Sequence, residues 1–368
     1  MKESRAIAKS GHDIVVMGAS AGGLEVVAQI VEHLSATLSA ALFVVIHTGP
    51  DTPGILPQIL MRRSEWPARH ARDGERIQHG VIYCAPPDHH LLLQDGHVQV
   101  LHGPKENGFR PAIDPLFRSA AAAYSTRVVG VILSGALDDG VHGLMRIKQR
   151  GGVAIVQNPE DAIVDALPLA AIKYVEIDHI AGAKQIAALL ERLAHEPAPE
   201  EIAPMDEDEV IEATVADGVH HILNSATPGR APSAFTCPDC GGSLWEMKNG
   251  KLVRYRCHVG HVYTADSLVM EKDAALENVL WTALRAMEES VALRHRMAKR
   301  AREGKISSVA ENFERRAEED EARARLLRQF LLPEEEKVTR TSENGRESKT
   351  KVERRNAAST NRKRKRRR

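Results

Sequence analysis

The sequence predicts an α/β fold: a doubly wound, mostly parallel sheet flanked by helices, followed by a small cysteine-containing unit and a C-terminal helical hairpin. From Asp13 to about Leu193, short apolar runs alternate with longer segments whose apolar residues have helical spacing. The runs are continuously apolar, as expected for parallel strands that helices cover on both faces. Beyond residue 265 only the helical spacing is found, so the last part of the chain should be helical.

Each strand-like run of the first part can be paired with the helix that follows it. In chain order the pairs are IVVMG with LEVVAQIVEHL, ALFVVIH with PGILPQILMRR, VVGVILSG with GVHGLMRIKQR, and GVAIVQ with PLAAIKYV. One section, VIYCAPPDHHLLLQDGHVQVLHG, differs because Pro-Pro and Asp-Gly separate its apolar runs. Such separators favour tight turns, so we expect antiparallel hairpin strands there.

Changes in composition set the expected domain boundaries. We predict an N-terminal extension at 1–12, the α/β domain at 13–194, an acidic, proline-rich linker with one short helical piece at 195–234, the cysteine-containing unit at 235–264, a helical hairpin or coiled coil at 265–332 and a disordered basic tail at 333–368. In the hairpin, apolar residues at spacings of three and four form a seam that weakens at Arg294. They are Leu276, Leu280, Leu284, Met287 and Val291.

Charge and composition exclude several classes of protein. The formal net charge of the 368 residues is +0, so no global field points to nucleic acid or membrane. The basic run Arg362–Arg368 could bind an acidic partner, but the tail has no aromatic residue to stack on bases, so no specific nucleic acid is predicted. No apolar stretch reaches about eighteen residues, and the N-terminus lacks the apolar core of a secretory signal. Four cysteines, three of them close together, indicate metal-binding thiols in the cytoplasm rather than disulfides.

The glycine-rich turn after the first strand, VVMGASAGG, allows two interpretations. Gly18-x-Ser20-x-x-Gly23 is one substitution away from the dinucleotide fingerprint, in which backbone N–H groups approach a pyrophosphate. Gly18-x-Ser20-x-Gly22 instead matches a strand-to-helix elbow that exposes a serine nucleophile. A dinucleotide site needs an acid at the end of the second strand, where this chain has His47. A histidine is a poor ribose acceptor but a suitable base for a serine hydroxyl.

Polar residues follow three of the predicted parallel strands, so their side chains should meet at one edge of the sheet. Ser20 follows the first strand, His47 the second, and Asp138 and Asp139 follow VVGVILSG. His47 would accept the Ser20 proton, and an aspartate on the other ring nitrogen would fix the tautomer. Each residue alone also fits an ordinary role, such as a helix N-cap for Ser20 or Asp139. Their coincidence at three strand ends favours catalysis.

The stretch from Asp13 to Leu193 resembles the catalytic domain of the CheB-like protein-glutamate methylesterases, which act on chemotaxis receptors. The matching segments are GASAGG, the histidine of VVIHTGP, DGERIQHGVIYCAPPDHHLLL, FRPAIDPLFRSAA, GVILSGALDDGVHGL and AIVQNPEDAIVDALP. The resemblance implies that Ser20 is the nucleophile, His47 the base and Asp139 the orienting acid. It also implies an oxyanion donor at the backbone N–H of Ala136, to which we add the N–H of Ala21 as a second donor.

The resemblance also implies a reaction and a class of substrate. The reaction is hydrolysis of a γ-glutamyl methyl ester on a protein through an acyl-enzyme on Ser20, and glutamine deamidation is the same chemistry with ammonia leaving. The substrate would be a methylated chemoreceptor-like or other signalling protein, with a methyltransferase as a further partner. Arg110 and Pro111 are expected to border the substrate cleft, as is Asp114 unless it caps the following helix. No cofactor is expected for the chemical steps.

Two departures from the family pattern bear on activity and regulation. The chemotaxis enzymes often carry threonine after the nucleophile, where this chain has Ala21. A hydroxyl that would help to place His47 is therefore missing, and a modest rate is expected. These enzymes also usually begin with a phosphorylatable receiver domain, whereas the first strand here starts at Asp13. We therefore expect no aspartyl-phosphate switch within this chain.

The cysteine-containing unit has the ligand spacing of a zinc ribbon. Cys237-x2-Cys240 precedes a hairpin-like KNGK turn, and Cys257-x3-His261 follows it. His258 is adjacent to Cys257 and should not reach the same ion, so His261 is preferred. Reduced core cysteines and a redox Cys-x2-Cys pair are the alternatives. Four ligands close a tetrahedral shell, so the predicted Zn²⁺ is structural, and the unit would bind a partner or the α/β domain.

The leading hypothesis of function is therefore a cytoplasmic methylesterase with a Ser-His-Asp mechanism. The alternative is a catalytically weak scaffold that binds methyl-accepting proteins or a methyltransferase through its C-terminal modules. The intact set of Ser20, His47 and Asp139 argues against the scaffold, while Ala21 leaves it open. Dinucleotide binding is the third hypothesis, and His47 disfavours it.

Overall fold

The computed structural model describes residues 11–200, 232–249 and 252–332. The helical piece expected in the linker and the basic tail lie outside these residues. Contacts divide the chain into two units, Met1–Lys272 and Asp273–Arg368, and each is described by itself. Among the helices of the described segments, none has the length and apolar character needed to cross a membrane.

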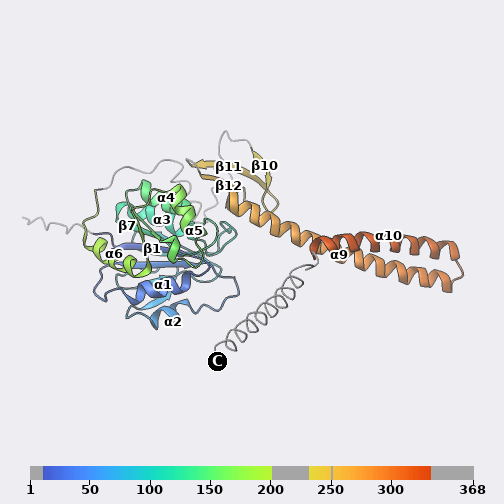
Figure 1. Cartoon of the computed structure of the whole chain (residues 1–368), viewed down its shortest axis with the longest axis horizontal. Coiled ribbons are helices and arrows are strands. Elements are labelled where there is room, and N and C mark those ends of the chain that lie inside the picture. The colour runs from blue at the N-terminus through green and yellow to red at the C-terminus, as the bar shows by residue number, and fades with distance from the viewer. Residues whose placement is uncertain (1–10, 201–231, 250–251, 333–368) are drawn as a thin grey trace, which may run out of the picture. The chain divides into compact units, whose positions relative to one another are not determined.

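A seven-stranded sheet forms the centre of the first unit (Figure 1). Its strands are, in spatial order, β3 (Ala68–His70), β4 (Ile82–Cys84), β2 (Ala41–Ile46), β1 (Ile14–Ala19), β7 (Val128–Ile132), β8 (Val153–Gln157) and β9 (His179–Ala181). All neighbouring strands are parallel, which confirms the predicted doubly wound α/β fold. The chain adds strands on one side of β1 and then on the other, so a crevice is expected at the carboxyl end of β1.

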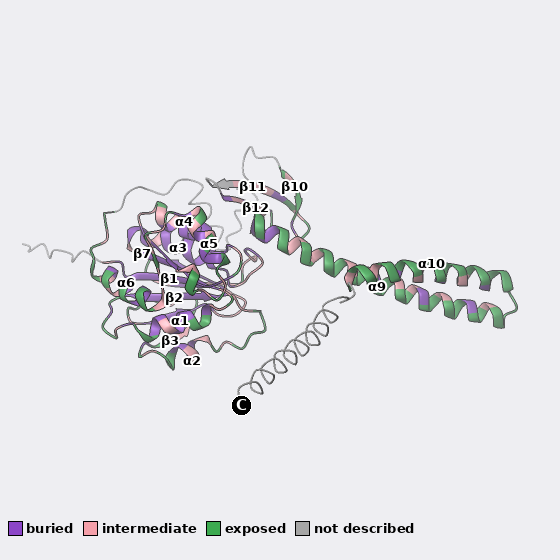
Figure 2. Cartoon of the chain, in the orientation of Figure 1, coloured by how far each residue is buried: buried purple, intermediate pink, exposed green. Residues whose placement is uncertain are grey.

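Helices cover both faces of this sheet (Figure 1). One face carries α1 (Gly23–Glu32), α2 (Leu56–Met61) and α6 (Ala183–His195), and the other carries α3 (Ile113–Tyr124), α4 (Val141–Gln149) and α5 (Ala166–Tyr174). Successive strand residues alternate between the two apolar clusters, as Val15 and Val16 do. The strands are therefore buried on both sides (Figure 2), which is why their sequences are continuously apolar.

The section expected to form only hairpin strands differs from that prediction. Its Asp-Gly turn does join two antiparallel strands, β5 (His90–Gln94) and β6 (His97–Leu101). The preceding run VIYC, however, forms β4 and pairs in parallel with β2 and β3 in the main sheet. Pro86-Pro87 therefore separates the main sheet from the hairpin rather than two strands of one hairpin.

A second, four-stranded antiparallel sheet carries the cysteines. Its strands are β10 (Pro232–Thr236), β11 (Ser243–Asn249), β12 (Leu252–Cys257) and β13 (Val262–Thr264). We call this sheet with its connecting turns the ribbon. Its apolar core is small and consists of Cys237, Leu244, Cys257, Tyr263 and Leu268. Val262 forms a parallel bridge with Glu106, so the ribbon packs on the α/β domain.

Two long helices, α9 (Ala265–Glu303) and α10 (Ser307–Leu331), make up the described part of the second unit from residue 273 onward. Buried residues recur every seven positions on both helices, the spacing of a coiled coil. They are Leu284, Val291 and Ala298 on α9, and Ala310, Ala317 and Ala324 on α10. Arg294, where the seam was expected to weaken, forms an ion pair with Asp320. The helical hairpin is confirmed, but Leu276 at the start of the predicted seam is 54% exposed.

Candidate active site

The turn after β1 presents Ser20 at the carboxyl edge of the sheet. The N–H of Ser20 donates to the carbonyl oxygen of Ser134 at 2.9 Å. Gly22 has a φ of 77°, and a Cβ at Gly23 would lie 2.3 Å from the Cβ of Ala19, so both positions need glycine. The helix α1 begins at Gly23 without a side-chain cap. Ser20 is therefore not an N-cap, and this turn is an elbow that exposes its hydroxyl.

His47 lies between Ser20 and Asp139. It follows β2, and its backbone N–H donates to the carbonyl oxygen of Ala19 at 3.1 Å. Its ring Nδ1 lies 3.1 Å from Ser20 Oγ, and its Nε2 lies 2.7 Å from Asp139 Oδ2. The carboxylate holds the ring proton on Nε2, which leaves Nδ1 as the acceptor for a serine proton. The His47 side chain is only 4% exposed. The ring of Phe109 stacks on its imidazole, with 3.7 Å between the ring centroids.

Asp139 is fully buried and receives several hydrogen bonds. The backbone N–H of Ile113 donates to its Oδ2 at 2.6 Å, and the Nδ2 of Asn107 donates to its Oδ1 at 2.9 Å. Burial acts to raise the pKa of Asp139. The hydrogen bond and charge of His47, with the donors of Ile113 and Asn107, outweigh that effect and hold the pKa below its usual value. The carboxyl group is therefore ionised where an imidazolium would need it.

Two further buried carboxyl groups surround Asp139. Asp114 lies at the start of α3 and accepts from the N–H of Gly143 at 2.7 Å, so it neither caps its own helix nor lines a cleft. Burial and the charge of Asp139 raise the pKa of Asp114. Burial also raises the pKa of Asp138 to about 6, against a hydrogen bond from Thr264 Oγ1 at 2.7 Å. The site thus concentrates acidic groups in a dry environment beneath His47.

The loop after β7 lies against the nucleophile. A Cβ at Gly135 would be 2.9 Å from the Cβ of Ser20. Ser134 Oγ donates to the carbonyl oxygen of Ala21 at 2.8 Å and ties this loop to the elbow. Within the described residues, the N–H groups of Ala21 and Ala136 donate to no protein acceptor. Both N–H groups are therefore available to a ligand beside Ser20.

An open cleft of about 450 Å³ contains Ser20 and His47. Its lining residues are Ser20, Ala21, His47, Thr48, Gly49, Pro50, Asp88, Lys105, Gly108, Phe109 and Arg110. Arg110 Nε donates to Asp88 Oδ1 at 2.8 Å, and its NH1 donates to the carbonyl oxygen of Gly103 at 2.7 Å. Of the two residues expected at the border, Arg110 lines the cleft, whereas Pro111 is buried and does not.

The ribbon brings its four expected ligands together. The ligand atoms of Cys237, Cys240, Cys257 and His261 all lie within 4.8 Å of one another, so the group could hold a metal ion. The Sγ atoms of Cys240 and Cys257 are 3.6 Å apart, and His261 Nδ1 lies 3.5 Å from Cys257 Sγ. His258 is outside the group and faces Trp245.

The sequence interpretation missed Asn107, Phe109 and Lys105. Asn107 contacts Asp139, Phe109 stacks on His47, and Lys105 lines the cleft. Asn-Gly at positions 107 and 108 is a turn signal that was available in the sequence. No sequence pattern indicates which residues that turn contacts.

Comparison with known proteins identifies similar sequences for the α/β domain. Residues 15–190 match the CheB methylesterase family. A Leptospira interrogans protein named "Putative protein-glutamate methylesterase/protein-glutamine glutaminase" is 35% identical over 183 residues, which cover 50% of this chain and 95% of that protein. Protein-glutamate methylesterase/protein-glutamine glutaminase 3 of Anaeromyxobacter dehalogenans is 41% identical over 160 residues, which cover 43% of this chain and 47% of the relative.

Among solved structures, the catalytic domain of the Thermotoga maritima CheB methylesterase is 33% identical. The match has a TM-score of 0.47 and covers 49% of this chain and 98% of that domain. The chain spans nearly all of the Leptospira relative and about half of the Anaeromyxobacter relative. From the matched residues 15–190 and the identity to a relative that it spans almost completely, the chain belongs to the CheB methylesterase family.

Proposed function

We propose that this chain is a protein-glutamate methylesterase that hydrolyses γ-glutamyl methyl esters on a methylated chemoreceptor-like protein. Glutamine deamidation is part of the same proposal, because only the leaving group differs. The observation that carries the proposal is the position of His47, which is hydrogen bonded to Ser20 on one side and to Asp139 on the other. The names of the relatives support the class of substrate.

In the proposed first step, Ser20 Oγ attacks the ester carbonyl carbon while His47 Nδ1 takes the hydroxyl proton. Asp139 stabilises the imidazolium that results. The tetrahedral intermediate collapses, His47 gives its proton to the departing methoxide, and methanol leaves. Water then attacks the acyl-enzyme while His47 takes one of its protons. When the second tetrahedral intermediate collapses, the bond to Ser20 Oγ breaks, His47 returns the proton to Ser20, and a glutamate side chain is released.

The oxyanion of both tetrahedral intermediates would be held by backbone donors. Ala21 follows Ser20 directly, and Ala136 follows Gly135, which lies against Ser20; neither N–H makes a hydrogen bond within the described residues. Donors of this kind are worth about 3 kcal/mol each in the transition state. Ala21 and Ala136 therefore contribute through the backbone, and their small side chains leave room above the serine.

Features of the cleft support a protein side chain as substrate. It is open and holds about 450 Å³, enough for one extended ester side chain but not for its helix. Lys105 on its wall suits a substrate segment rich in glutamate, whereas the charge of Arg110 is paired with Asp88. Phe109, stacked on His47, offers an apolar surface to the methylene groups.

For the ribbon we propose a structural Zn²⁺ held by Cys237, Cys240, Cys257 and His261. In a tetrahedral centre with Zn–S bonds of about 2.3 Å, two sulfurs are about 3.8 Å apart. The Sγ atoms of Cys240 and Cys257, 3.6 Å apart, fit this spacing. Four protein ligands leave no open position, so the ion would hold the ribbon together and take no part in hydrolysis. Free thiols serving as ligands also fit a cytoplasmic location.

The test is methanol release from a purified receptor fragment that carries glutamate methyl esters. Wild type should release methanol, and Ser20→Ala should lose the activity by a factor of about 10⁴ or more. The control Ser39→Ala changes an exposed serine away from the cleft and should keep full activity. Fluorophosphonate labelling should modify wild type and Ser39→Ala but not Ser20→Ala. A wild-type protein that binds the fragment but neither releases methanol nor reacts with the label would contradict the proposal and favour the scaffold.

A further inference from the structure

A tight turn at Glu106–Phe109 contacts two members of the proposed triad at once; we call it the Asn107 turn. Glu106 and Phe109 exchange backbone hydrogen bonds of 3.2 and 2.9 Å. Asn107 and Gly108 between them have φ angles of 53° and 82°, as in a type I′ turn. This geometry sends the Asn107 side chain to Asp139 and the Phe109 ring to His47.

The amide of Asn107 uses all four of its hydrogen-bonding positions. Its Nδ2 donates to Asp139 Oδ1 at 2.9 Å and faces Asp114 Oδ2 at 3.4 Å. Its Oδ1 accepts from the N–H of Thr264 at 2.9 Å and from Ser267 Oγ at 2.9 Å. Asn107 is 1% exposed, so loss of the partners on one side would leave a buried polar atom unsatisfied. The Nδ2 atom of this amide thus contacts the triad acid Asp139, and its Oδ1 atom contacts Thr264 and Ser267 in the C-terminal part of the chain.

The residues that hold Asn107 come from Val262–Ser267, which we call the clasp. It comprises β13 and the first turn of α9. The Asn107 N–H donates to the carbonyl oxygen of Val262 at 2.7 Å, and Thr264 Oγ1 donates to Asp138 Oδ1 at 2.7 Å. Thr264 Oγ1 also accepts from the N–H of Ser267 at 3.1 Å, the pattern of a helix N-cap. The clasp begins directly after His261, one of the proposed metal ligands.

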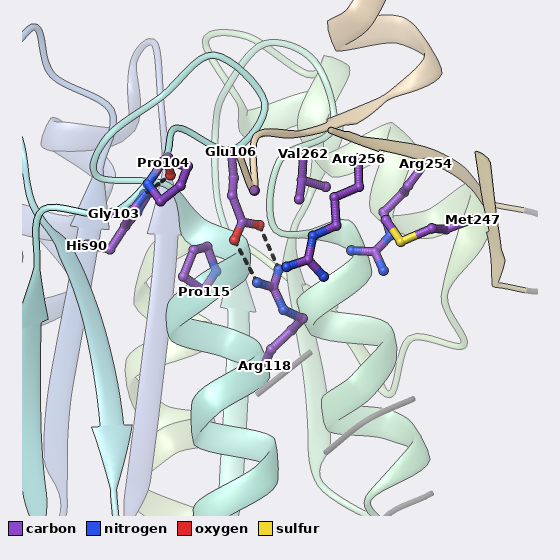
Figure 3. A pocket seen from close by; sticks show the side chains of 11 residues that line it. His90, Gly103, Pro104, Glu106, Pro115, Arg118, Met247, Arg254, Arg256 and Val262 are labelled. Atoms are coloured by element: carbon purple, nitrogen blue, oxygen red, sulfur yellow. Dashed lines mark hydrogen bonds and ion pairs between the residues drawn. The ribbon is translucent and has the colours of Figure 1, made fainter. Parts of the chain in front are cut away.

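The ribbon also covers the other side of the Asn107 turn (Figure 3). Glu106 forms a buried ion pair with Arg118 of α3, with distances of 2.7 and 2.8 Å. Arg254 and Arg256 of β12 point toward this pair. Burial acts to raise the pKa of Glu106, but Arg118, with His90 and Arg254, holds it below its usual value. A charge from the ribbon thus helps to keep Glu106 ionised for its pair with Arg118.

We infer that the clasp is a positioning element for the proposed hydrolase: Thr264 and Ser267 hold Asn107, and Asn107 holds Asp139 against His47. This inference rests on the proposed function, because it concerns the rate of the same site. It makes the activity of the α/β domain depend on a docked ribbon, and so on the metal that would hold the ribbon together. The clasp itself does not line the cleft, but Gly108 and Phe109 of the Asn107 turn do. The backbone bond from Asn107 to Val262 keeps that turn in place when clasp side chains are changed, so kcat should change more than KM.

The test uses the full chain and the double variant Thr264→Val/Ser267→Ala. It removes the Ser267 hydroxyl that donates to Asn107 Oδ1 and the Thr264 hydroxyl that bonds Asp138 and caps α9, while the Thr264 N–H still donates to Asn107. We expect kcat to fall about tenfold with KM unchanged within about twofold, since the coupling of two sites is typically of this size. Thr264→Ser keeps the hydroxyl and should retain the wild-type kcat. Ser233→Ala removes a hydroxyl that donates to the carbonyl oxygen of Leu244 within the ribbon, and it should also behave as wild type.

A second readout needs no substrate. The ¹⁵N resonances of the His47 ring report its hydrogen bond to Asp139 and should shift in the double variant but not in Ser233→Ala. A folded double variant with wild-type kcat and unshifted resonances would overturn the inference. If wild type itself hydrolyses no ester, the proposed function fails, and the His47 resonances alone decide the inference. If the double variant loses its metal or melts early, Ser267→Ala decides it, with an expected fall in kcat of about threefold.

Discussion

The Ser20–His47–Asp139 site and the cluster of three cysteines and His261 belong to the same unit but are held in different ways. The first set comes from the ends of three strands, with 27 positions between Ser20 and His47 and 92 between His47 and Asp139. Apolar clusters on both faces of the sheet place those strand ends. The second set lies within residues 237–261, and the cysteines themselves make up part of a core of five residues.

The two sites differ in the interactions that stabilise their geometry. Burial of apolar side chains positions the backbone at the ends of β1, β2 and β7, so a triad side chain can be removed without loss of the fold. The ribbon buries too little apolar surface to hold its ligands in the same way, and ligand bonds to an ion must supply the rest. A change at the triad should therefore lower activity without unfolding, whereas a change at the metal cluster should unfold the ribbon.

Loss of the metal is the largest expected effect. Cys257→Ser or a strong chelator should unfold the ribbon, because a structural zinc contributes on the order of 10 kcal/mol to folding. Hydrogen exchange should show loss of protection in β11 and β12 and unchanged protection in β1 and β7. Cys84→Ala, a buried cysteine of β4 outside the cluster, is the matched control and should keep one zinc per chain. If β11 and β12 keep their protection from hydrogen exchange after complete chelation, the metal is not what holds the ribbon together.

His47→Ala should produce the opposite pattern. We expect kcat to fall by about 10⁴, or about 5 kcal/mol of transition-state stabilisation, because the base and its contact with Asp139 are both lost. The zinc content should stay that of wild type, and the thermal midpoint should fall by only a few degrees, because buried Asp139 loses one partner but keeps the donors of Ile113 and Asn107. His33→Ala, an exposed histidine at the end of α1, serves as the control in all three measurements. A His47→Ala protein that melts early would mean that the triad also supports the fold.

Much of this organisation was predictable because its signals are local. Continuous apolar runs predicted the parallel sheet, and the position of Ser20, His47 and Asp139 after such runs predicted that they would meet. The cysteine spacing predicted which four side chains come together. The fold class is confirmed, and the roles of these residues stay predictions. The local signals failed for VIYC. Its strand, Ile82–Cys84, has only three residues, and so short a run does not reveal whether the neighbouring strands are parallel or antiparallel.

The contacts around Asn107 could not be predicted from the sequence, for a different reason. Asn107 and Thr264 are separated by 157 positions, and their contact exists only because the ribbon packs on the α/β domain. Nothing in the ENG or VYTADS segments indicates that pairing. The stack of Phe109 on His47 likewise depends on how the Asn107 turn lies over the sheet edge. Loop contacts between distant segments follow from packing and not from periodicity.

Asp138 connects the two regions, because it follows β7 of the main sheet and accepts a hydrogen bond from Thr264 of the clasp. Burial raises its pKa to about 6 in the folded protein, above the ordinary aspartate value of 3.8. Between about pH 4 and 6 the folded chain therefore holds a proton that the unfolded chain releases, and the free energy of unfolding falls as the pH rises.

Asp138→Asn keeps an acceptor for Thr264 and removes this titration. The fall in unfolding free energy between pH 4 and pH 8 should be about 2 kcal/mol smaller than in wild type. Urea titrations at a series of pH values measure the difference, with the exposed Asp51→Asn as control. A variant that follows the wild-type pH curve would show that Asp138 is ionised throughout this range.

Phe109→Leu is the smallest expected effect and tests what the Asn107 turn adds to a geometry already set by strands. The backbone at the end of β2 places His47, and the Phe109 ring limits how that imidazole rotates. Stacking of this kind is worth about 1 kcal/mol, so kcat should fall about fivefold, which methanol release under saturating substrate would measure. Phe235→Leu changes a ribbon aromatic that packs on Tyr255, and its kcat should equal that of wild type. If Phe109→Leu also retains full kcat, strand positions and the Asp139 hydrogen bond alone suffice to orient the ring. The turn would then act through Asn107 only, and the ribbon would reach the site by that single amide.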